Sequence, residues 1–355
     1  MTLDALRQRI DQLDEQLVRL LNERTSAAME IGRVKQANGQ EIYVPAREKA
    51  VLDRVFRLNQ GPLAADSLNA IYREIMSAAL ALEHDLKIAY LGPQATFTHQ
   101  AARARFGASV TYIACQTISD VFQSVQKRET DYGVVPIENS TEGAVTHTLD
   151  EFFNTPLKIC AEIYLRISHH LMATGPLDQV KRLYSNPQVF GQCRRWLLDH
   201  LPQVDLVPVS STARAAEMAV QEPESGALAS TLAAELYGLN LLHRDLQDIS
   251  GNTTRFLVVG PQYGAATGTD KTSVFFTVKH KAGALCAALD VLRRNGLNMT
   301  KIESRPSKAR PWEYVFFVDL EGHAADAPVA KALDELNEHC ALVTILGAYP
   351  QAQSG

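Results

Sequence analysis

The chain has 355 residues, of which 46% are hydrophobic and 21% are charged, and its formal net charge is −5 at pH 7. A chain of this length buries more than one core, so we expect two or three domains. The acidic balance and the lack of a sustained basic stripe argue against nucleic acid as a partner, and no apolar run is long enough to cross a bilayer.

Five cysteines are spread along the chain, and none of them forms a Cys-x-x-Cys pair. This pattern favours a reducing compartment without a disulfide frame or a structural zinc ion. The N-terminus is charged and lacks the apolar core of a signal peptide. We therefore expect a cytoplasmic protein with no metal ion, no cofactor and no membrane partner.

Residues 3–38 are predicted to form one amphipathic helix about 50 Å long, because apolar residues recur at spacings of three and four from Leu6 to Leu21. Two further helices, over residues 45–58 and 67–82, are too few to cover this apolar stripe. We therefore expect residues 1–85 to form an all-α helical bundle that a second copy of the chain completes. The expected assembly is a homodimer, and a tetramer is left open.

Residues 86–262 alternate short strands and helices, which predicts an α/β domain with a parallel sheet. The alternation comes in two runs, so we expect two lobes with a cleft between them. Residues 260–269 are rich in Gly, Ala and Thr and predict a flexible linker. Residues 271–350 follow the βαββαβ order of an α+β ferredoxin-like domain, with one strand predicted over residues 312–320.

Cations recur on one face of the first helix. Arg24 and Lys35 are eleven residues apart, which places them on nearly the same face about three turns apart. Arg7 is offset by about a quarter turn and is positioned to lean toward the opposite copy in a dimer. Arg47 and Glu48 open the second helix. Surface cations are usually solvated, so this pattern alone leaves a solvated face as the alternative.

The same residues resemble the helical chorismate mutase family over residues 3–83, through Leu-Arg at 6–7, Glu-Arg at 23–24, Gly-Arg-Val-Lys ending at Lys35 and Pro-Ala-Arg-Glu ending at Glu48. The resemblance implies that Arg24, Arg47 and the partner's Arg7 hold the two carboxylates of chorismate. It also implies that Lys35 meets the ether oxygen and that Glu48 takes the ring hydroxyl. A Claisen rearrangement needs a compact conformer and a cation where negative charge builds, which suits such a site.

Three positions depart from one branch of that family, which has Asp, Ser and Gln where this chain has Val44, Ala79 and Glu83. Glu83 is predicted to contact the ether oxygen, and a carboxyl group donates a hydrogen bond only when it is protonated. Burial must therefore raise the pKa of Glu83, or mutase activity falls at higher pH.

Small polar residues gather at four strand ends, over residues 136–141, 185–192, 210–213 and 251–256. Helix capping is the alternative for several of the serines and threonines. Helix N-termini also bind anions, and four such clusters together favour a substrate with two carboxylates.

These clusters resemble the prephenate dehydratase family over residues 87–260, through Val-Pro-Ile-Glu-Asn-Ser at 135–140 and Thr-Arg-Phe at 254–256. The resemblance implies a fold like the two-lobed periplasmic binding proteins, with prephenate bound between the lobes. Thr254 matches the essential threonine and is predicted to donate to the leaving hydroxyl, while Arg255 anchors a carboxylate. The role of Glu138 stays open. The predicted prephenate site comprises Asn139, Ser140, Ser185, Gln192, Ser211, Thr212, Thr254, Arg255 and Phe256.

Gly-Ala-Leu at 283–285 and Glu-Ser-Arg-Pro at 303–306 lie at element ends of the C-terminal residues 271–350. With these two motifs the segment resembles an ACT regulatory domain, which implies feedback inhibition by L-phenylalanine. Cys286 stands where the first phenylalanine-binding motif commonly has His. A structural ferredoxin-like dimeriser is the alternative. The predicted phenylalanine site comprises Gly283, Ala284, Leu285, Asn298, Glu303, Ser304, Arg305 and Pro306.

Taken together, the resemblances imply a bifunctional enzyme that converts chorismate to prephenate and then to phenylpyruvate. One alternative is a monofunctional prephenate dehydratase with a degenerate mutase-like dimerisation module. The other is a non-catalytic amino-acid or anion sensor, which the two binding-protein-like lobes suggest and Thr254 opposes.

Overall fold

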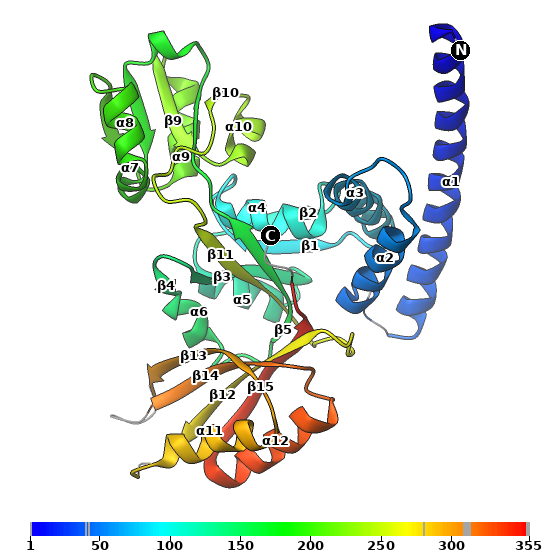
Figure 1. The fold of residues 1–355 in the computed structure, drawn as a ribbon, viewed down its shortest axis with the longest axis vertical. Coiled ribbons are helices and arrows are strands. Elements are labelled where there is room, and N and C mark those ends of the chain that lie inside the picture. The colour runs from blue at the N-terminus through cyan, green and yellow to red at the C-terminus, as the bar shows by residue number, and fades with distance from the viewer. Residues whose placement is uncertain (1, 40, 42, 280, 308–313, 353–355) are drawn as a thin grey trace. The chain divides into compact units, whose positions relative to one another are not determined.

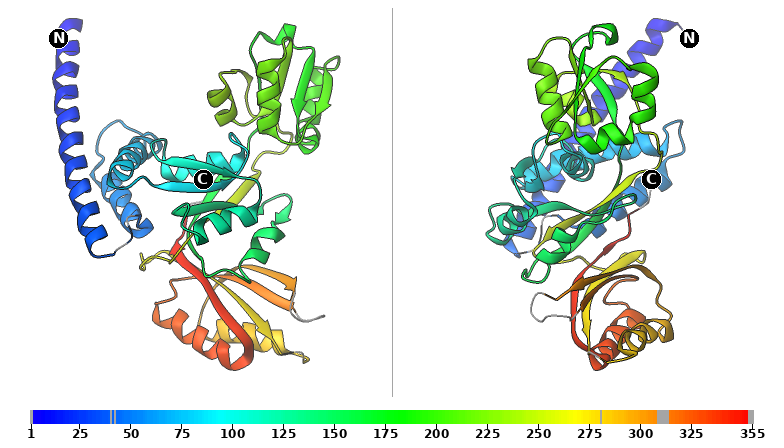
Figure 2. Two further views of the ribbon diagram at one scale, coloured as in Figure 1. Left: turned by 180° about the vertical axis from the view of Figure 1, so that it is seen from behind. Right: turned by 90° about the vertical axis from the view of Figure 1, so that its left-hand side faces the viewer.

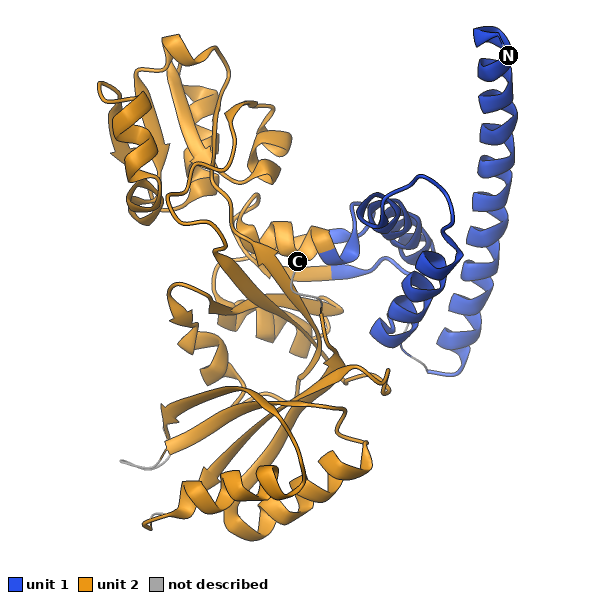
Figure 3. Cartoon of the chain, viewed as in Figure 1, with its two compact units in different colours: residues 1–87, 105–111 blue, residues 88–104, 112–355 orange. Residues whose placement is uncertain are grey.

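The computed structural model describes residues 2–39, 41, 43–279, 281–307 and 314–352. The chain forms two compact units, shown in different colours in Figure 3. Unit 1 contains Met1–Lys87 together with Arg105–Thr111, and unit 2 contains Ile88–Ala104 and Tyr112–Gly355.

Unit 1 contains three long helices, α1 (Leu3–Ala37), α2 (Pro45–Leu58) and α3 (Ala65–Glu83), as the sequence predicted. Thr2 caps α1 by accepting a hydrogen bond from the backbone of Ala5, and Pro45 supplies the first residue of α2. Helices α2 and α3 leave most of the apolar stripe of α1 exposed, as in an incomplete bundle. The exposed members of the stripe are Leu3, Leu6, Ile10, Leu13, Leu17, Leu20 and Leu21.

Unit 2 is built on two sheets, and the larger has the strand order β13-β14-β12-β15-β5-β11-β3-β1-β2, with β4 paired to β3. Its strands that precede residue 265 are β1 (Lys87–Leu91), β2 (Thr111–Cys115), β3 (Tyr132–Asn139), β4 (Gly143–Ala144), β5 (Lys158–Arg166) and β11 (Thr253–Gly260). Helices α4 (Phe97–Phe106), α5 (Ile118–Gln126) and α6 (Thr146–Glu151) connect them. Because α5 and α6 bury Val121, Phe122 and Leu149 against this sheet, they form its core.

The predicted parallel sheet is wrong in part. Strands β1 and β3 are parallel, but β11 is antiparallel to both β3 and β5. The chain leaves the first lobe after β5 and returns on β11, so the returning strand runs opposite to its neighbours (Figure 1). Strand β5 is not among the predicted strands, because it is buried on both faces and lacks polar alternation.

The second sheet has the order β10-β6-β9-β7-β8 and forms the second lobe. It consists of β6 (His170–Ala173), β7 (Arg182–Ser185), β8 (Asp205–Pro208), β9 (Ser225–Ala229) and β10 (Asn240–His243), with helices α7 (Pro187–Gln192), α8 (Arg194–His200), α9 (Thr212–Gln221) and α10 (Thr231–Tyr237). Strand β7 is parallel to β8 and β9, whereas β6 is antiparallel to β9 and β10. Two mixed sheets linked by two crossings give the expected two-lobed architecture.

The C-terminal part has the predicted βαββαβ order, with β12 (Asp270–Val278), α11 (Ala284–Arg294), β13 (Met299–Pro306), β14 (Tyr314–Glu321), α12 (Ala327–His339) and β15 (Cys340–Pro350). The first residues of the strand predicted over 312–320 lie outside the described residues. Figure 2 shows α11 and α12 on one face of these strands, where they bury a common core.

Strand β15 joins this domain to the first lobe, because it pairs in parallel with β5 at Gly347 and Ile159. A Cβ atom on Gly347 would lie 2.2 Å from the carbonyl oxygen of Ile159, so only glycine allows this approach. The strands of both domains thus form one continuous sheet.

Candidate active sites

The helical unit contains a pocket of about 400 Å³. Five of the six predicted chorismate-binding residues line it, and all three helices contribute: Arg24 and Lys35 from α1, Arg47 and Glu48 from α2, and Glu83 from α3. Apolar side chains such as Ile31, Val51 and Met76 form the remaining wall. Three cations around an apolar wall suit a compact dianion. Val44 and Ala79 also line this pocket.

The sixth residue, Arg7, is not among the residues that line this pocket. Its side chain is exposed on α1 and lies 3.7 Å from the carboxylate of Asp4, one turn earlier. Its contact with substrate in a partner chain stays a prediction.

Glu83 packs against the one buried residue of α1, Gly32, where a Cβ atom would lie 3.0 Å from the Glu83 side chain. Burial raises the pKa of the Glu83 carboxyl, and the charges of Lys35 and Arg24 oppose this rise in part. The direction is the one that the hydrogen-bonding role requires, because a raised pKa keeps the donor form to higher pH.

Glu48 has an ion-pair partner that the sequence pattern does not predict. Nη2 of Arg105 lies 2.6 Å from Oε2 of Glu48, and Nε of Arg105 donates to the hydroxyl of Tyr43 at 2.7 Å. Arg105 lies in the last turn of α4 and belongs to unit 1. Since 57 positions separate it from Glu48, no local pattern links the two residues.

Thr254 lies in a polar cluster at the start of β11, paired in register with Asn139 at the end of β3. Nδ2 of Asn139 donates to Oγ1 of Thr254 at 2.8 Å and to Oδ1 of Asn252 at 2.7 Å. Ser140 joins the cluster by accepting a hydrogen bond from the backbone of Thr253 at 3.0 Å. Because Asn139 fills an acceptor position of Thr254, the hydroxyl proton of Thr254 stays available as a donor.

Arg255 does not fit its expected role as a carboxylate ligand. Side chains alternate along a strand, so Arg255 points to the face opposite Thr254. There it is 5% exposed and donates to Glu162 of β5, Asp319 of β14 and Tyr349 of β15. All three donor groups of the guanidinium are therefore occupied.

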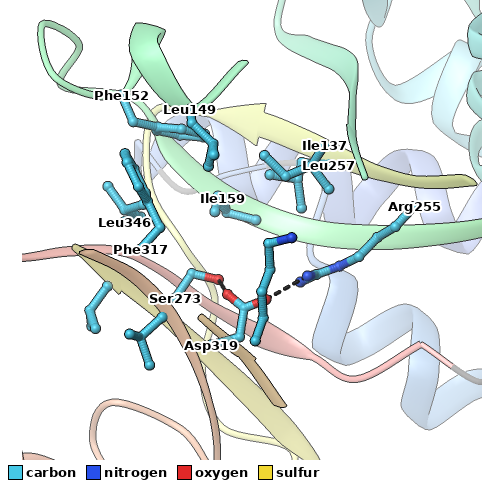
Figure 4. A pocket seen from close by; sticks show the side chains of 13 residues that line it. Ile137, Leu149, Phe152, Ile159, Arg255, Leu257, Ser273, Phe317, Asp319 and Leu346 are labelled. Carbon is cyan, nitrogen blue, oxygen red and sulfur yellow. Dashed lines mark hydrogen bonds and ion pairs between the residues drawn. The ribbon is translucent and has the colours of Figure 1, made fainter. Parts of the chain in front are cut away.

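We call this group the Arg255 cluster: Arg255, Glu162, Lys271, Ser273, Asp319 and Tyr349. Nζ of Lys271 lies 2.8 Å from Oε2 of Glu162, and Ser273 bonds both Asp319 and Tyr349. Figure 4 shows Arg255 and Ser273 converging on Asp319 beside a small apolar void. Burial by itself lowers the pKa of Arg255, but the nearby Tyr349, Asp319 and Glu162 raise it above the ordinary value. Two cations and two carboxylates balance within the cluster.

The remaining residues of the predicted prephenate site are distributed over both lobes. Ser185 and Phe256 are fully buried, and the Ser185 hydroxyl donates to the carbonyl of Leu228, so neither fits the expected role of a ligand. Oε1 of Gln192 lies 2.8 Å from Nε2 of the buried His169. Ser211 caps α9, and the buried Thr212 begins that helix.

The predicted phenylalanine-binding residues lie at element ends of the C-terminal domain. Gly283 has a φ of 77° and precedes α11, which begins with Ala284 and Leu285. Asn298 precedes β13, which carries Glu303, Ser304, Arg305 and Pro306. Strand β13 is an edge of the large sheet.

Two ion pairs join β13 to the first lobe. Nζ of Lys301 lies 2.8 Å from a carboxylate oxygen of Glu138, the residue before Asn139. Arg305 lies 3.2 Å from Asp150 of α6. Glu138, which the sequence left without a role, is thus paired with the C-terminal domain.

A cation-lined pocket in a helical unit, a two-lobed α/β domain with a Thr-Asn cluster and a βαββαβ domain together define a multidomain enzyme for small anionic substrates. Family models agree with this class: chorismate mutase type II matches residues 6–84, prephenate dehydratase matches 88–263, and the ACT domain matches 272–338.

Relatives of known name share the complete arrangement. The bifunctional chorismate mutase/prephenate dehydratase of Aquifex aeolicus is 48% identical over 355 residues, which cover 99% of this chain and 98% of that protein. The enzyme of the same name from Pseudomonas aeruginosa is 44% identical over 357 residues, with 99% and 98% covered. The chain therefore belongs to the family of bifunctional chorismate mutase/prephenate dehydratases.

A solved structure is similar to the two C-terminal domains. It is the prephenate dehydratase of Arthrobacter aurescens in complex with L-Phe, which is 36% identical with a TM-score of 0.69. The match covers 75% of this chain and 90% of that one.

Proposed function

We propose that the chain rearranges chorismate to prephenate in the helical unit and converts prephenate to phenylpyruvate in the two-lobed domain. The observation that carries the first step is the gathering of Arg24, Lys35, Arg47, Glu48 and Glu83 around one pocket. This gathering also opposes the alternative of a degenerate mutase-like module, since a module kept only for dimerisation needs no such arrangement.

In the mutase step, Arg24 and Arg47 bind the two carboxylates and hold the substrate in its compact conformer. Lys35 and the protonated Glu83 stabilise the negative charge that builds on the ether oxygen as the C–O bond breaks. Glu48 accepts a hydrogen bond from the ring hydroxyl. The step uses orientation and electrostatics, and no covalent bond to the protein is required.

In the dehydratase step, Thr254 donates a hydrogen bond to the departing ring hydroxyl while the ring carboxylate leaves as carbon dioxide. Asn139 orients the Thr254 hydroxyl through the 2.8 Å hydrogen bond. The ring hydroxyl leaves as water and so needs one proton, which threonine is too weak an acid to supply by itself. We therefore assign Thr254 a hydrogen-bonding or relay role that passes a proton from solvent to the hydroxyl. Ser140, Gln192, Ser211 and Thr212 stay candidates for contacts with prephenate.

L-Phenylalanine is the proposed feedback inhibitor, bound at the ends of α11 and β13. The L-Phe complex of the Arthrobacter aurescens enzyme supports this assignment. The pairs Lys301–Glu138 and Arg305–Asp150 offer a direct connection from β13 to the residues around Asn139. A shift of β13 on binding would therefore reach the Thr254 cluster.

A homodimer is the proposed assembly, because the exposed apolar stripe of α1 needs a second apolar surface and Arg7 needs a pocket to enter. None of the five cysteines forms a disulfide in the structure, which fits the proposed cytosolic location.

One coupled experiment tests the proposed function. Purified protein is given chorismate, and prephenate and phenylpyruvate are followed by chromatography, with and without L-phenylalanine. The expected result is transient prephenate, then phenylpyruvate, with the second step slowed by L-phenylalanine. Failure to consume chorismate while prephenate is still converted would leave the monofunctional alternative.

A further inference from the structure

Arg105, which pairs with Glu48, belongs to the part of the sequence that the dehydratase family model matches. Residues 88–263 match that family, yet residues 105–111 belong to the compact helical unit. Arg105 is thus contributed to the mutase unit by a segment that lies beyond the residues matched by the mutase family, 6–84.

Several close contacts hold this segment on α3. The backbone N–H groups of Ala108 and Ser109 donate to Glu74 at 3.0 Å and to Ser77 at 3.1 Å. A Cβ atom on Gly107 would come within 2.4 Å of Ser77, so glycine is required at this position. The segment is therefore fitted tightly to the unit.

The Arg105 side chain is held at two points. Its Nε donates to the hydroxyl of Tyr43, and its guanidinium carbon lies 5.7 Å from the centroid of the same ring. Its Nη2 meets Oε2 of Glu48 at 2.6 Å. Arg105 does not line the pocket, whereas Tyr43 and Glu48 do. Arg105 therefore reaches the pocket through these two side chains.

The electrostatics explain why such a group is needed. A pocket for a dianion contains the carboxylate of Glu48, and an uncompensated carboxylate would repel the substrate. Arg105 compensates this charge from outside the pocket through the ion pair with Oε2. The hydrogen bond from Nε of Arg105 to the Tyr43 hydroxyl holds the guanidinium in place beside this carboxylate.

We propose that Arg105 is a positioning residue of the mutase site, which orients Glu48 and balances its charge. This inference rests on the proposed mutase function. It makes the mutase site dependent on a segment that the dehydratase family model covers, so a fragment ending near residue 85 lacks one of its working parts.

Arg105→Gln in the full-length protein tests the proposal. We expect kcat/KM for chorismate to fall about 10- to 100-fold, because the charge that compensates Glu48 is lost. Turnover of prephenate should stay within about twofold, which also shows that the variant is folded. The matched control is Arg103→Gln, on the same helix, where Arg103 pairs with the exposed Glu235. It should leave both activities unchanged.

A double variant separates positioning from a purely structural role. If Arg105 acts through Glu48, then Glu48→Gln combined with Arg105→Gln is no slower than Glu48→Gln alone. Arg105→Lys should restore part of the loss. Additive losses, or an Arg105→Gln variant as active as the wild type on chorismate, would overturn the inference. Absence of mutase activity in the wild type would instead overturn the proposed function.

Discussion

The mutase pocket and the Arg255 cluster contain similar charged side chains but use them in opposite ways. In the pocket, three cations and two carboxylates surround an open volume of about 400 Å³, and Arg105 pairs with Glu48 from outside the pocket lining. In the Arg255 cluster, two cations and two carboxylates fill one another's hydrogen-bonding positions next to a void of about 20 Å³. Charged side chains around an open volume indicate a binding site, whereas charged side chains that fill one another's hydrogen-bonding positions indicate a structural contact between domains.

Thr254 and Arg255 are adjacent, but we expect the first to act in catalysis and the second in stability. Substitution of Thr254 has the largest expected effect. Thr254→Ala should lower dehydratase turnover by about 10²- to 10⁴-fold, because the donor to the leaving hydroxyl is lost. The measurement is phenylpyruvate formation from prephenate. Thr254→Ser keeps the hydroxyl and should retain most activity, and mutase activity should not change. Near-normal turnover in a folded Thr254→Ala protein would contradict the assignment.

Arg255→Met should instead act on stability. The change leaves the buried Asp319 and Glu162 without a partner that each of them has in the native state. We expect the free energy of unfolding, measured by urea denaturation, to fall by about 3–5 kcal/mol. Arg293→Met removes an exposed pair with Asp290 and should change it by less than about 0.5 kcal/mol. If the two variants had the same free energy of unfolding, the Arg255 cluster would not contribute to stability.

Lys35→Ala tests the role of the cations that line the mutase pocket. Loss of the cation at the ether oxygen should lower mutase turnover by about 10²- to 10³-fold without unfolding the protein. Lys49→Ala is the control, because Lys49 lies on α2 but pairs with Asp53, outside the residues that line the pocket. A Lys35→Ala enzyme with unaltered chorismate turnover would remove Lys35 from the mechanism.

The smallest effect concerns pH. Burial raises the pKa of Glu83, and the protonated form is the donor, so mutase activity is present below this pKa and is lost as pH rises through it. One pH unit above the pKa, about a tenth of the donor form remains. Glu83→Gln keeps an amide donor at every pH and should flatten the alkaline limb. Identical profiles for wild type and Glu83→Gln, recorded with chorismate, would show that Glu83 does not donate.

Local pattern was enough to predict the helices and the pocket. The spacing of Arg24 and Lys35 on α1 follows from helix geometry, and the motifs place Arg47 and Glu48 on the next helix. The order of strands and helices in the C-terminal domain could also be predicted from the sequence, since strand and helix patterns alternate there. These features depend on contacts within or between neighbouring elements.

The features that sequence missed depend on distant contacts. Arg105 meets Glu48 across 57 positions, and the partners of Arg255 lie on three other strands. Side chains alternate along a strand, so the sequence alone could have predicted that Thr254 and Arg255 lie on opposite faces of β11. Strand β5 could not be predicted in this way, because its burial on both faces removes the alternation of polar and apolar residues by which strands are recognised.

The pairing of β15 with β5 has a consequence for aggregation. In the continuous sheet, β11 pairs along one edge of β5, and β15 covers the other edge at the Gly347–Ile159 pair. A chain cut before β12 would leave one edge of this buried strand unpaired and ready to bind another strand. The C-terminal domain thus also protects this edge of the first lobe from pairing with strands of other chains. This protection does not depend on a bound inhibitor.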